Sequence, residues 1–169
     1  MSTRRIRARV ASARPLSVGY VEERRLIFHK RGRDGSAKAD ALFTGVAADR
    51  VWGVVFSIRR DELPILDRYE AGYDLEEVTV SSTRGIAESG DNDIAVSSTS
   101  RTVRAITYVA NRKRIDPSLK PFSWYHGFVM HGAREHGLPA EYLQALEMIE
   151  AIADTDHLRH KRNLQLICV

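Results

Sequence analysis

The chain has 169 residues, of which 43% are hydrophobic and 28% are charged, and its formal net charge is +4 at pH 7. This length and composition predict a single compact domain with an ordinary core, and they exclude an intrinsically disordered chain. The basic balance is compatible with nucleic acid, but the 26 basic residues are spread among 22 acidic ones, so an acidic small molecule fits equally well as a partner.

Cysteine content and hydropathy restrict where the protein works. Cys168 is the one cysteine, so neither an internal disulfide nor a cysteine-based zinc site is expected, and a reducing cytoplasm is the expected location. No run approaches the ~20 apolar residues of a membrane helix, which disfavours membrane insertion. Residues 1–20 contain five arginines and no acidic residue, a composition that fits either an organelle transit peptide or a basic first helix.

The first part of the chain is predicted to form one helix and then strands. Residues 3–11 can make a short helix that begins at Ser2 or Thr3, and Pro15 ends it. Residues 32–36 are a loop by composition. Extended segments are expected on both sides of that loop, at residues 16–18, 25–28, 41–44 and 51–56. The last of these is apolar on both faces, which predicts a central strand.

A second helix is predicted over residues 60–70, where apolar residues recur at spacings near three and four. Pro64 falls in its first turn, and Gly72 ends it. A strand is predicted next, at residues 78–81, and another at residues 102–110. Residues 82–100 between them are predicted to be a polar loop, broken by a short apolar segment at 94–96.

Two helices are predicted in the last part of the chain. Residues 122–136 and 140–153 both have apolar side chains at helical spacing, and Gly137-Leu138-Pro139 separates them. Strands come first and the longer helices come last, without regular alternation, so the predicted class is α+β. We expect one domain over residues 1–153, followed by a basic C-terminal tail at 154–169.

Common motifs for nucleotide, phosphate, zinc and serine-nucleophile chemistry are missing from the sequence. His126, His131 and His136 are five positions apart, which rotates them around a helix instead of stacking them on one face. The basic N-terminal helix and the run at 157–162 match no nucleic-acid-binding motif, so both are interpreted as solvated surface. No metal site is expected, and nucleic acid is disfavoured as a partner.

Glu70 is the first candidate for chemistry. It ends the amphipathic helix at 60–70 beside Tyr69 and Tyr73, directly before a strand. By itself such a glutamate is usually a surface residue, because Glu is rarely buried without a partner.

Further segments follow one another in a distinctive order around Glu70. They are 51–56 (Val-Trp-Gly-Val-Val-Phe), 63–70 (Leu-Pro-Ile-Leu-Asp-Arg-Tyr-Glu), Tyr73 with 78–80 (Val-Thr-Val), 105–109 (Ala-Ile-Thr-Tyr-Val) and 132–142 (Gly-Ala-Arg-Glu-His-Gly-Leu-Pro-Ala-Glu-Tyr). In order and spacing they resemble the gamma-glutamylcyclotransferase family, which has an AIG2-like fold. Residues at the N-terminus fit the family's first helix, namely Arg5, Arg9, Ser12 and Ala13. The resemblance covers residues 1–153.

The resemblance implies a fold, an activity and a set of site residues. The family fold is a small mixed β-barrel flanked by helices, and the activity is release of 5-oxoproline from a gamma-glutamyl amide without a metal or organic cofactor. Glu70 matches the catalytic glutamate, and Tyr125 matches a tyrosine that lines the substrate site. Tyr73 and Tyr108 match two further tyrosine positions. The leaving amine and the oligomeric state are left open.

One part of the family pattern precedes this sequence. The family begins with a strand that ends in Tyr-Gly-Ser-Asn, whose backbone N–H groups cradle the substrate, and Met1 aligns directly after that asparagine. The resemblance therefore implies that the first strand is missing and that Met1 and Ser2 are the remnant of the loop. Either a start upstream of Met1 or a natural truncation would account for this.

The expected chemistry needs one proton carrier in a pocket that Glu70 and Tyr125 share, although they are 55 positions apart. Glu70 would accept a proton from the substrate's α-ammonium and return it to the departing amine, and we expect an apolar, partly buried setting for it.

Two alternative functions stay open. A non-catalytic binding protein of this fold would expose Glu70 outside any pocket, and a nucleic-acid-binding module would use the basic helix and tail.

Overall fold

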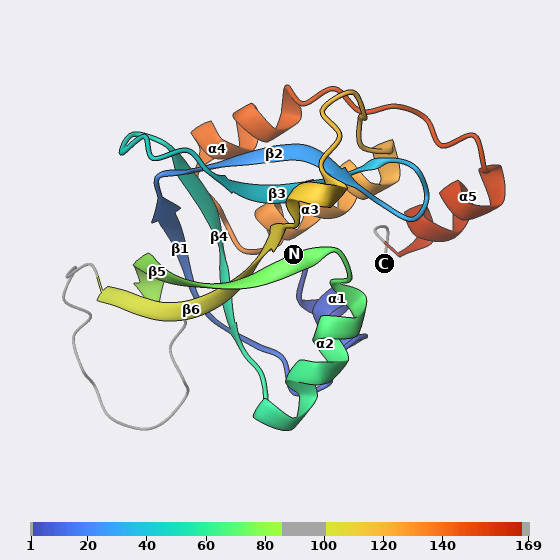
Figure 1. Ribbon diagram of the computed structural model, residues 1–169. Coiled ribbons are helices and arrows are strands. Elements are labelled where there is room, and N and C mark those ends of the chain that lie inside the picture. The colour runs from blue at the N-terminus through green and yellow to red at the C-terminus, as the bar shows by residue number, and fades with distance from the viewer. Residues whose placement is uncertain (1, 86–100, 167–169) are drawn as a thin grey trace.

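The computed structural model describes residues 2–85 and 101–166, arranged as in Figure 1. The strands are β1 (Arg14–Glu22), β2 (Arg24–Arg31), β3 (Ala37–Phe43), β4 (Arg50–Ser57), β5 (Tyr73–Gly85) and β6 (Arg101–Ala110). The α-helices are α1 (Thr3–Arg7), α2 (Leu63–Tyr69), α3 (Ser123–Glu135), α4 (Ala140–Glu147) and α5 (His157–Gln165). Short 3-10 helices precede α2 and follow β6, namely η1 (Arg60–Glu62) and η2 (Arg112–Arg114). The predicted α+β class is confirmed.

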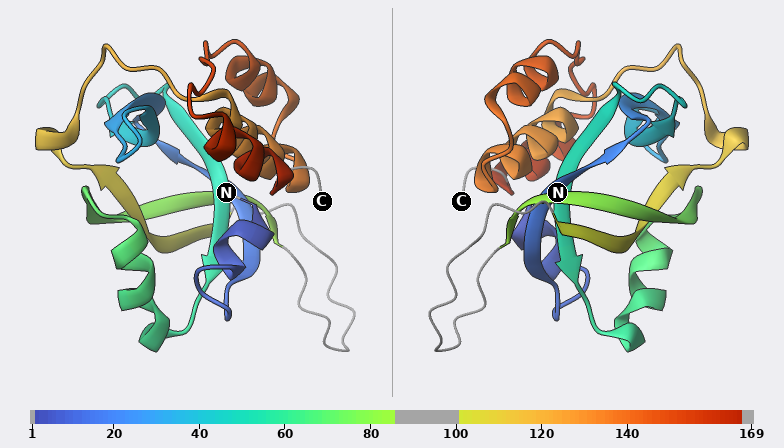
Figure 2. Two further views of the ribbon diagram at one scale, coloured as in Figure 1. Left: turned by 90° about the vertical axis from the view of Figure 1, so that its right-hand side faces the viewer. Right: turned by 90° about the vertical axis from the view of Figure 1, so that its left-hand side faces the viewer.

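Four strands form a curled antiparallel sheet in the order β4-β1-β5-β6, and β2 and β3 form a separate antiparallel pair. Among the described strands the sheet is not closed into a barrel, because β4 and β6 are its two end strands. Figure 2 shows α3, α4 and α5 grouped together on one side of the strands, away from α2. No helix in residues 2–85 and 101–166 is long and apolar enough to cross a membrane.

The prediction that residues 51–56 form a central strand is wrong, because β4 is an end strand of the sheet. Its apolar character has another cause. Trp52 and Val54 pack against the core formed with α3 and α4, while Val51 and Val55 line an apolar hollow on the other face of the sheet. An end strand with both faces partly covered therefore has the same sequence pattern as a central strand.

The two helices that lead to the candidate site have the predicted beginnings. The Ser2 hydroxyl accepts the N–H of Arg5 at 3.3 Å, as an N-cap does, but α1 ends at Arg7 instead of residue 11. Pro64 lies in the first turn of α2, and Gly72 after the helix has φ of +85°, a conformation that glycine adopts without strain.

Two predicted boundaries are wrong. The loop expected to begin at residue 82 begins later, since β5 continues to Gly85 and pairs with both β1 and β6; the rest of that loop, with its apolar segment at 94–96, lies outside the described residues. The helix predicted to reach residue 153 ends at Glu147. Ile152 instead forms a parallel bridge with Phe122, and its N–H donates to the Pro121 carbonyl at 2.9 Å. Pairing with the start of α3 therefore replaces the last helical turns.

Residues 154–166, predicted as a basic tail, contain the helix α5. The carboxylate of Asp154 receives hydrogen bonds from Trp124 Nε1 on α3 at 2.8 Å and from Arg159 Nε on α5 at 2.6 Å. The Asp156 side chain caps the first turn of α5 through the N–H of Arg159. These contacts attach α5 to α3.

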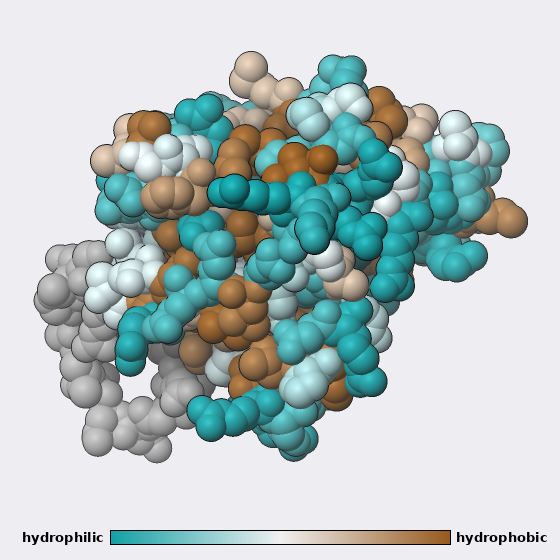
Figure 3. Space-filling model, in the orientation of Figure 1, coloured by the Kyte–Doolittle hydropathy of each residue, from teal (hydrophilic) through white to brown (hydrophobic). Residues whose placement is uncertain are grey.

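In the described residues, most of the buried apolar side chains fall into three clusters. The first joins β1 to α3 and α4, the second joins α1 to α2, and the third lies at the start of α3. Figure 3 shows apolar side chains exposed over the region of β5 and β6. Leu75 on β5 and Ile106 on β6 are both exposed. Elements from all three clusters surround the pocket described next.

Candidate active site

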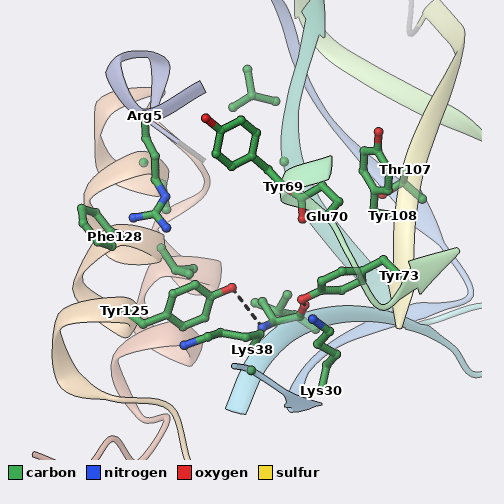
Figure 4. A pocket seen from close by; sticks show the side chains of 18 of the residues that line it. Arg5, Lys30, Lys38, Tyr69, Glu70, Tyr73, Thr107, Tyr108, Tyr125 and Phe128 are labelled. Atoms are coloured by element: carbon green, nitrogen blue, oxygen red, sulfur yellow. Dashed lines mark hydrogen bonds between the residues drawn. The ribbon is translucent and has the colours of Figure 1, made fainter. Parts of the chain in front are cut away.

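A pocket of about 500 Å³ lies where the N-terminal segment, the end of α2, the β2–β3 pair and α3 meet. Glu70, Tyr73, Tyr108 and Tyr125 all line it, so the structure brings together four residues that are spread over 56 sequence positions. Figure 4 shows their side chains around one space. A volume of this size can hold a dipeptide-sized molecule.

Glu70 is the C-cap of α2, and its side chain is 15% exposed. Arg9 Nη1 donates to Glu70 Oε1 at 2.6 Å, and the Arg9 guanidinium also lies 5.0 Å from the centre of the Tyr69 ring. A carboxylate at the C-terminal end of a helix is unfavourable by itself, since it faces the negative end of the helix dipole, and Arg9 offsets that cost. The setting is partly buried as expected, but it is charged instead of apolar.

Tyr73 and Tyr125 make hydrogen bonds of opposite direction with one residue, Ala39 on β3. The Tyr73 hydroxyl donates to the Ala39 carbonyl at 2.7 Å, whereas the Tyr125 hydroxyl accepts the Ala39 N–H at 3.1 Å. Burial raises the pKa of both phenols, so both are neutral hydroxyls near neutral pH. The backbone of Ala39 therefore holds both hydroxyls at the pocket. The Tyr73 proton is already donated to Ala39, whereas the Tyr125 proton is not.

Tyr108 lies on β6 and donates its hydroxyl proton to Asp67 Oδ1 at 2.5 Å. Burial, reinforced by this hydrogen bond, raises the pKa of the Tyr108 phenol. In Figure 4 its hydroxyl points away from the space between Tyr73 and Tyr125. Tyr108 thus lines the pocket with its ring, while its hydroxyl proton is donated to Asp67 on α2.

Sequence reasoning assigned none of the cationic residues in the lining to the site, and three of these residues lie close to aromatic rings of the pocket. Arg5 lies over the Phe128 ring at 4.0 Å, and Lys30 lies 4.4 Å from the centre of the Tyr73 ring. Lys38 lies 4.5 Å from the centre of the Tyr125 ring. Burial lowers the pKa of all three groups. The one available signal was the spacing of four between Arg5 and Arg9, which puts both on the same side of a helical segment.

The oxygen partners of these cations differ. Lys38 Nζ donates to Asp34 Oδ2 at 2.6 Å, and Lys30 Nζ donates to the carbonyl of Ala71 at 2.9 Å. Within residues 2–85 and 101–166, no oxygen accepts a hydrogen bond from the Arg5 guanidinium. Glu70 is the one carboxylate in the described lining, so the pocket has an excess of positive charge.

The two remaining predicted site residues are at the N-terminus. Met1 is outside the described residues, and Ser2 is buried as the cap of α1 and is not part of the pocket lining. No group of three or more His, Cys, Asp or Glu side chains that could hold a metal ion occurs in the part of the chain that the structure describes.

Comparisons with known proteins agree with this fold. The AIG2-like family matches residues 50–146. A gamma-glutamylcyclotransferase from Bos taurus is 30% identical over 158 residues, which cover 88% of this chain and 73% of the bovine protein. Two solved structures have the same fold at 23% identity. One is a gamma-glutamyl cyclotransferase (TM-score 0.76, covering 97% of this chain and 92% of that one), and the other is an uncharacterised protein from Homo sapiens (TM-score 0.75, covering 98% and 91%). The chain therefore belongs to the AIG2-like gamma-glutamylcyclotransferase family.

Proposed function

We propose that this protein is a gamma-glutamylcyclotransferase, which releases 5-oxoproline from a gamma-glutamyl amide with Glu70 as the general acid and base. The observation that carries the proposal is the position of Glu70. It is the one carboxylate among the described lining residues, and its partner Arg9 contacts Oε1, while Oε2 receives no hydrogen bond from any described residue. A carboxylate that lines a pocket, with one oxygen held by an arginine and the other without a donor, is suited to carry a proton. The bovine relative, named as a gamma-glutamylcyclotransferase, supports the reaction class.

The substrate holds its nucleophile and its electrophile in one molecule. Glu70 accepts a proton from the α-ammonium, and the resulting amine attacks the γ-carbonyl carbon to close a five-membered ring. As the C–N bond to the leaving amine breaks, Glu70 returns the proton to that nitrogen. The second proton, which the attacking nitrogen loses on becoming the lactam N–H, passes to the same leaving nitrogen, so the amine departs as an ammonium ion. Because the attack is intramolecular, holding the substrate in a folded conformation supplies several kcal/mol of the acceleration.

The electrostatics of the pocket support an anionic substrate. Lys30, Lys38 and Arg5 surround the space with positive charge, which favours both the carboxylate of a gamma-glutamyl group and the negative charge that develops on the carbonyl oxygen. The described residues supply acid–base groups and cations for this reaction, so the proposed steps use side chains alone.

The structure gives less support to the two alternative functions. A binding protein without catalysis was expected to expose Glu70 outside any pocket, whereas Glu70 is 15% exposed and lines one. A nucleic-acid-binding module built on the first helix would need the arginines of that helix to be free to contact phosphates. Arg5 and Arg9 instead line the pocket, and Arg7 Nε donates to the Ala13 carbonyl at 2.9 Å.

The test is release of 5-oxoproline from gamma-glutamyl-alanine and from glutathione, measured for the wild type and Glu70→Gln. The Gln side chain keeps the shape and can still accept from Arg9, but it cannot carry the proton. We expect the turnover to fall by roughly 100- to 10,000-fold. Glu141→Gln, an exposed glutamate in the first turn of α4, is the matched control and should retain wild-type turnover. Wild-type rates in Glu70→Gln would remove the acid–base role.

A further inference from the structure

We propose that the leaving amine of the substrate carries two or more negative charges, as an acidic or a phosphorylated amino acid does, and that Lys30, Arg33 and Arg114 bind this part of the substrate. The inference rests on the proposed function, because it names the substrate class for the same reaction. It concerns the part of the substrate beyond the amide bond that breaks. Its basis is the charge balance of the pocket and the position of these three cations.

The described pocket lining has more cations than its own carboxylate and a gamma-glutamyl group can balance. The cationic side chains that line it are Arg5, Arg9, Lys30, Arg33, Lys38 and Arg68. Arg9 pairs with Glu70, and Lys38 pairs with Asp34, which is outside the lining. The other cations have no carboxylate partner among the described residues. A gamma-glutamyl group brings one ammonium and one carboxylate, so its net charge is zero and the excess is left for the leaving amine to balance.

Lys30 brings this excess charge to the end of α2, where the amide bond would break. Its Nζ donates to the carbonyl of Ala71 at 2.9 Å, and Ala71 directly follows Glu70. Figure 4 shows Lys30 beside Tyr73 and away from Arg5. Because Glu70 has to reach the leaving nitrogen to protonate it, the atoms attached to that nitrogen also lie at this end of the pocket. An anionic group on them is within reach of Lys30.

Two arginines lie next to Lys30. A Cβ atom at Gly72 would be 3.2 Å from Lys30 Cε and 3.3 Å from Arg114 Cγ, so both side chains pack over this glycine. Arg33 lies in the turn between β2 and β3 and lines the pocket. Burial lowers the pKa of the Lys30 ammonium, and Glu70 opposes that shift, whereas the charges of Arg114 and Arg33 add to it. All three cations therefore act on one another.

Neither arginine is used by the fold. Both are exposed, and neither guanidinium donates a hydrogen bond to an acceptor in residues 2–85 and 101–166. Neighbouring cations repel one another, and an anion between them removes the repulsion and accepts charge-assisted hydrogen bonds. Three cations are better matched by two negative charges than by the single carboxylate of a neutral amino acid. Because the arginines are exposed, we expect a moderate effect that salt screens.

The test compares two substrates that differ by one charge on the leaving amine. Gamma-glutamyl-glutamate and gamma-glutamyl-glutamine have nearly the same shape, but the second has a neutral amide in place of the side-chain carboxylate. We expect kcat/KM of the wild type to be about 10-fold higher for gamma-glutamyl-glutamate at low ionic strength, and this ratio to fall to about 2-fold in about 0.5 M NaCl.

A second pair of substrates distinguishes the two kinds of anion. Gamma-glutamyl-O-phosphoserine is compared with gamma-glutamyl-serine in the same assay. A preference for the charged member of either pair supports the proposal, and the larger ratio identifies the carboxylate or the phosphate as the better match. A ratio near one for both pairs would overturn it.

Variants locate the preference on the molecule. Arg33→Gln and Arg114→Gln should each lower the ratio between gamma-glutamyl-glutamate and gamma-glutamyl-glutamine by about 2- to 5-fold, and the double variant should bring it close to one. Arg112→Gln is the matched control, because Arg112 is an exposed cation of the same 3-10 helix as Arg114 and lies outside the pocket lining. An equal drop in Arg112→Gln would mean that the net charge of the protein sets the preference, and the assignment to Lys30, Arg33 and Arg114 would be wrong.

Binding measured by calorimetry keeps the inference separate from the proposed reaction. In the Glu70→Gln variant, which removes turnover, gamma-glutamyl-glutamate should bind about 10-fold more tightly than gamma-glutamyl-glutamine. The same preference in a wild type that releases no 5-oxoproline would support the anionic ligand and refute the reaction. Release of 5-oxoproline with equal kcat/KM and equal affinity for the two substrates would support the reaction and overturn the inference. No binding of any of these ligands would overturn both.

Discussion

Asp154 and Glu70 are each paired with an arginine, but the surroundings of the two carboxylates differ. The Asp154 side chain is fully buried, and donors reach both of its oxygens. Trp124 Nε1 and Arg159 Nε donate to Oδ2, while Arg159 Nη2 and the N–H of Asp156 donate to Oδ1, at 2.5–2.9 Å. Every oxygen of Asp154 is thus used to hold α5 against α3.

Glu70 is also paired with an arginine and lines the pocket, but one of its oxygens receives one donor and the other receives none from the described residues. A carboxylate whose oxygens are all satisfied by the fold has no capacity left for a ligand or a proton, and its role is structural. A carboxylate that the fold satisfies only in part is available for chemistry. The count of donors per oxygen, more than burial or the presence of an arginine, separates the two sites.

The largest expected effect comes from neutralising the open carboxylate. Glu70→Gln should reduce kcat by about 1,000-fold while the free energy of unfolding stays within about 1 kcal/mol of the wild type, because Arg9 keeps an amide oxygen as its acceptor. Enzyme assays and urea unfolding on the same preparation measure the two quantities. A variant that loses several kcal/mol of stability would show that Glu70 is as structural as Asp154.

Neutralising Asp154, whose two oxygens both accept hydrogen bonds, should lower the stability and leave the turnover unchanged. Asp154→Asn replaces an acceptor oxygen with an NH2 group facing donors, so the free energy of unfolding should fall by about 1–3 kcal/mol while kcat per folded molecule is unchanged. Asp61→Asn is the control, since Asp61 is an exposed residue paired with Arg59, and it should have almost no effect. If kcat fell in Asp154→Asn with stability intact, donor saturation would not distinguish the two sites.

The same comparison explains what could be predicted from sequence. Helix α2 with Glu70 at its end follows from Pro64, the apolar spacing and Gly72, all of which act locally. The α+β class and the family follow from the order of segments. The roles of Glu70 and the tyrosines stay predictions, although the structure places all of them around one pocket.

What the sequence could not predict depends on contacts between distant backbone segments. The opposite directions of the Tyr73 and Tyr125 hydrogen bonds come from the peptide groups of Ala39, and an alanine gives no side-chain signal. The early end of α4 comes from the bridge between Phe122 and Ile152, which no helical pattern reveals. In the second case, tertiary pairing overrides local helix propensity.

Replacing Arg9, the arginine that donates to Glu70, should have a smaller effect on kcat. Arg9→Gln leaves Oε1 with a neutral donor and loosens the orientation of the carboxylate, so kcat should fall by about 10-fold. Arg9→Lys, which restores the charge, should recover part of the loss, whereas loss of packing alone would leave the two variants equal. Steady-state kinetics of both variants on gamma-glutamyl-alanine measures this.

The smallest expected effect is the pH dependence of the stability that the Asp154–Arg159 ion pair contributes. Hydrogen bonds from Arg159, Trp124 and Asp156 hold the pKa of the Asp154 carboxyl well below its ordinary value of 3.8 in the folded protein. The unfolded chain therefore binds the proton first, so the stability that the Asp154 ion pair contributes is present above about pH 4 and is lost as the pH falls below it. Thermal unfolding of the wild type and Asp154→Asn between pH 6 and pH 3 isolates this group, because the other carboxyls titrate in both proteins. The gap in melting temperature should be constant down to about pH 5 and should then narrow toward pH 3. A gap that stays constant over the whole range would mean that the stability difference does not depend on the charge of Asp154.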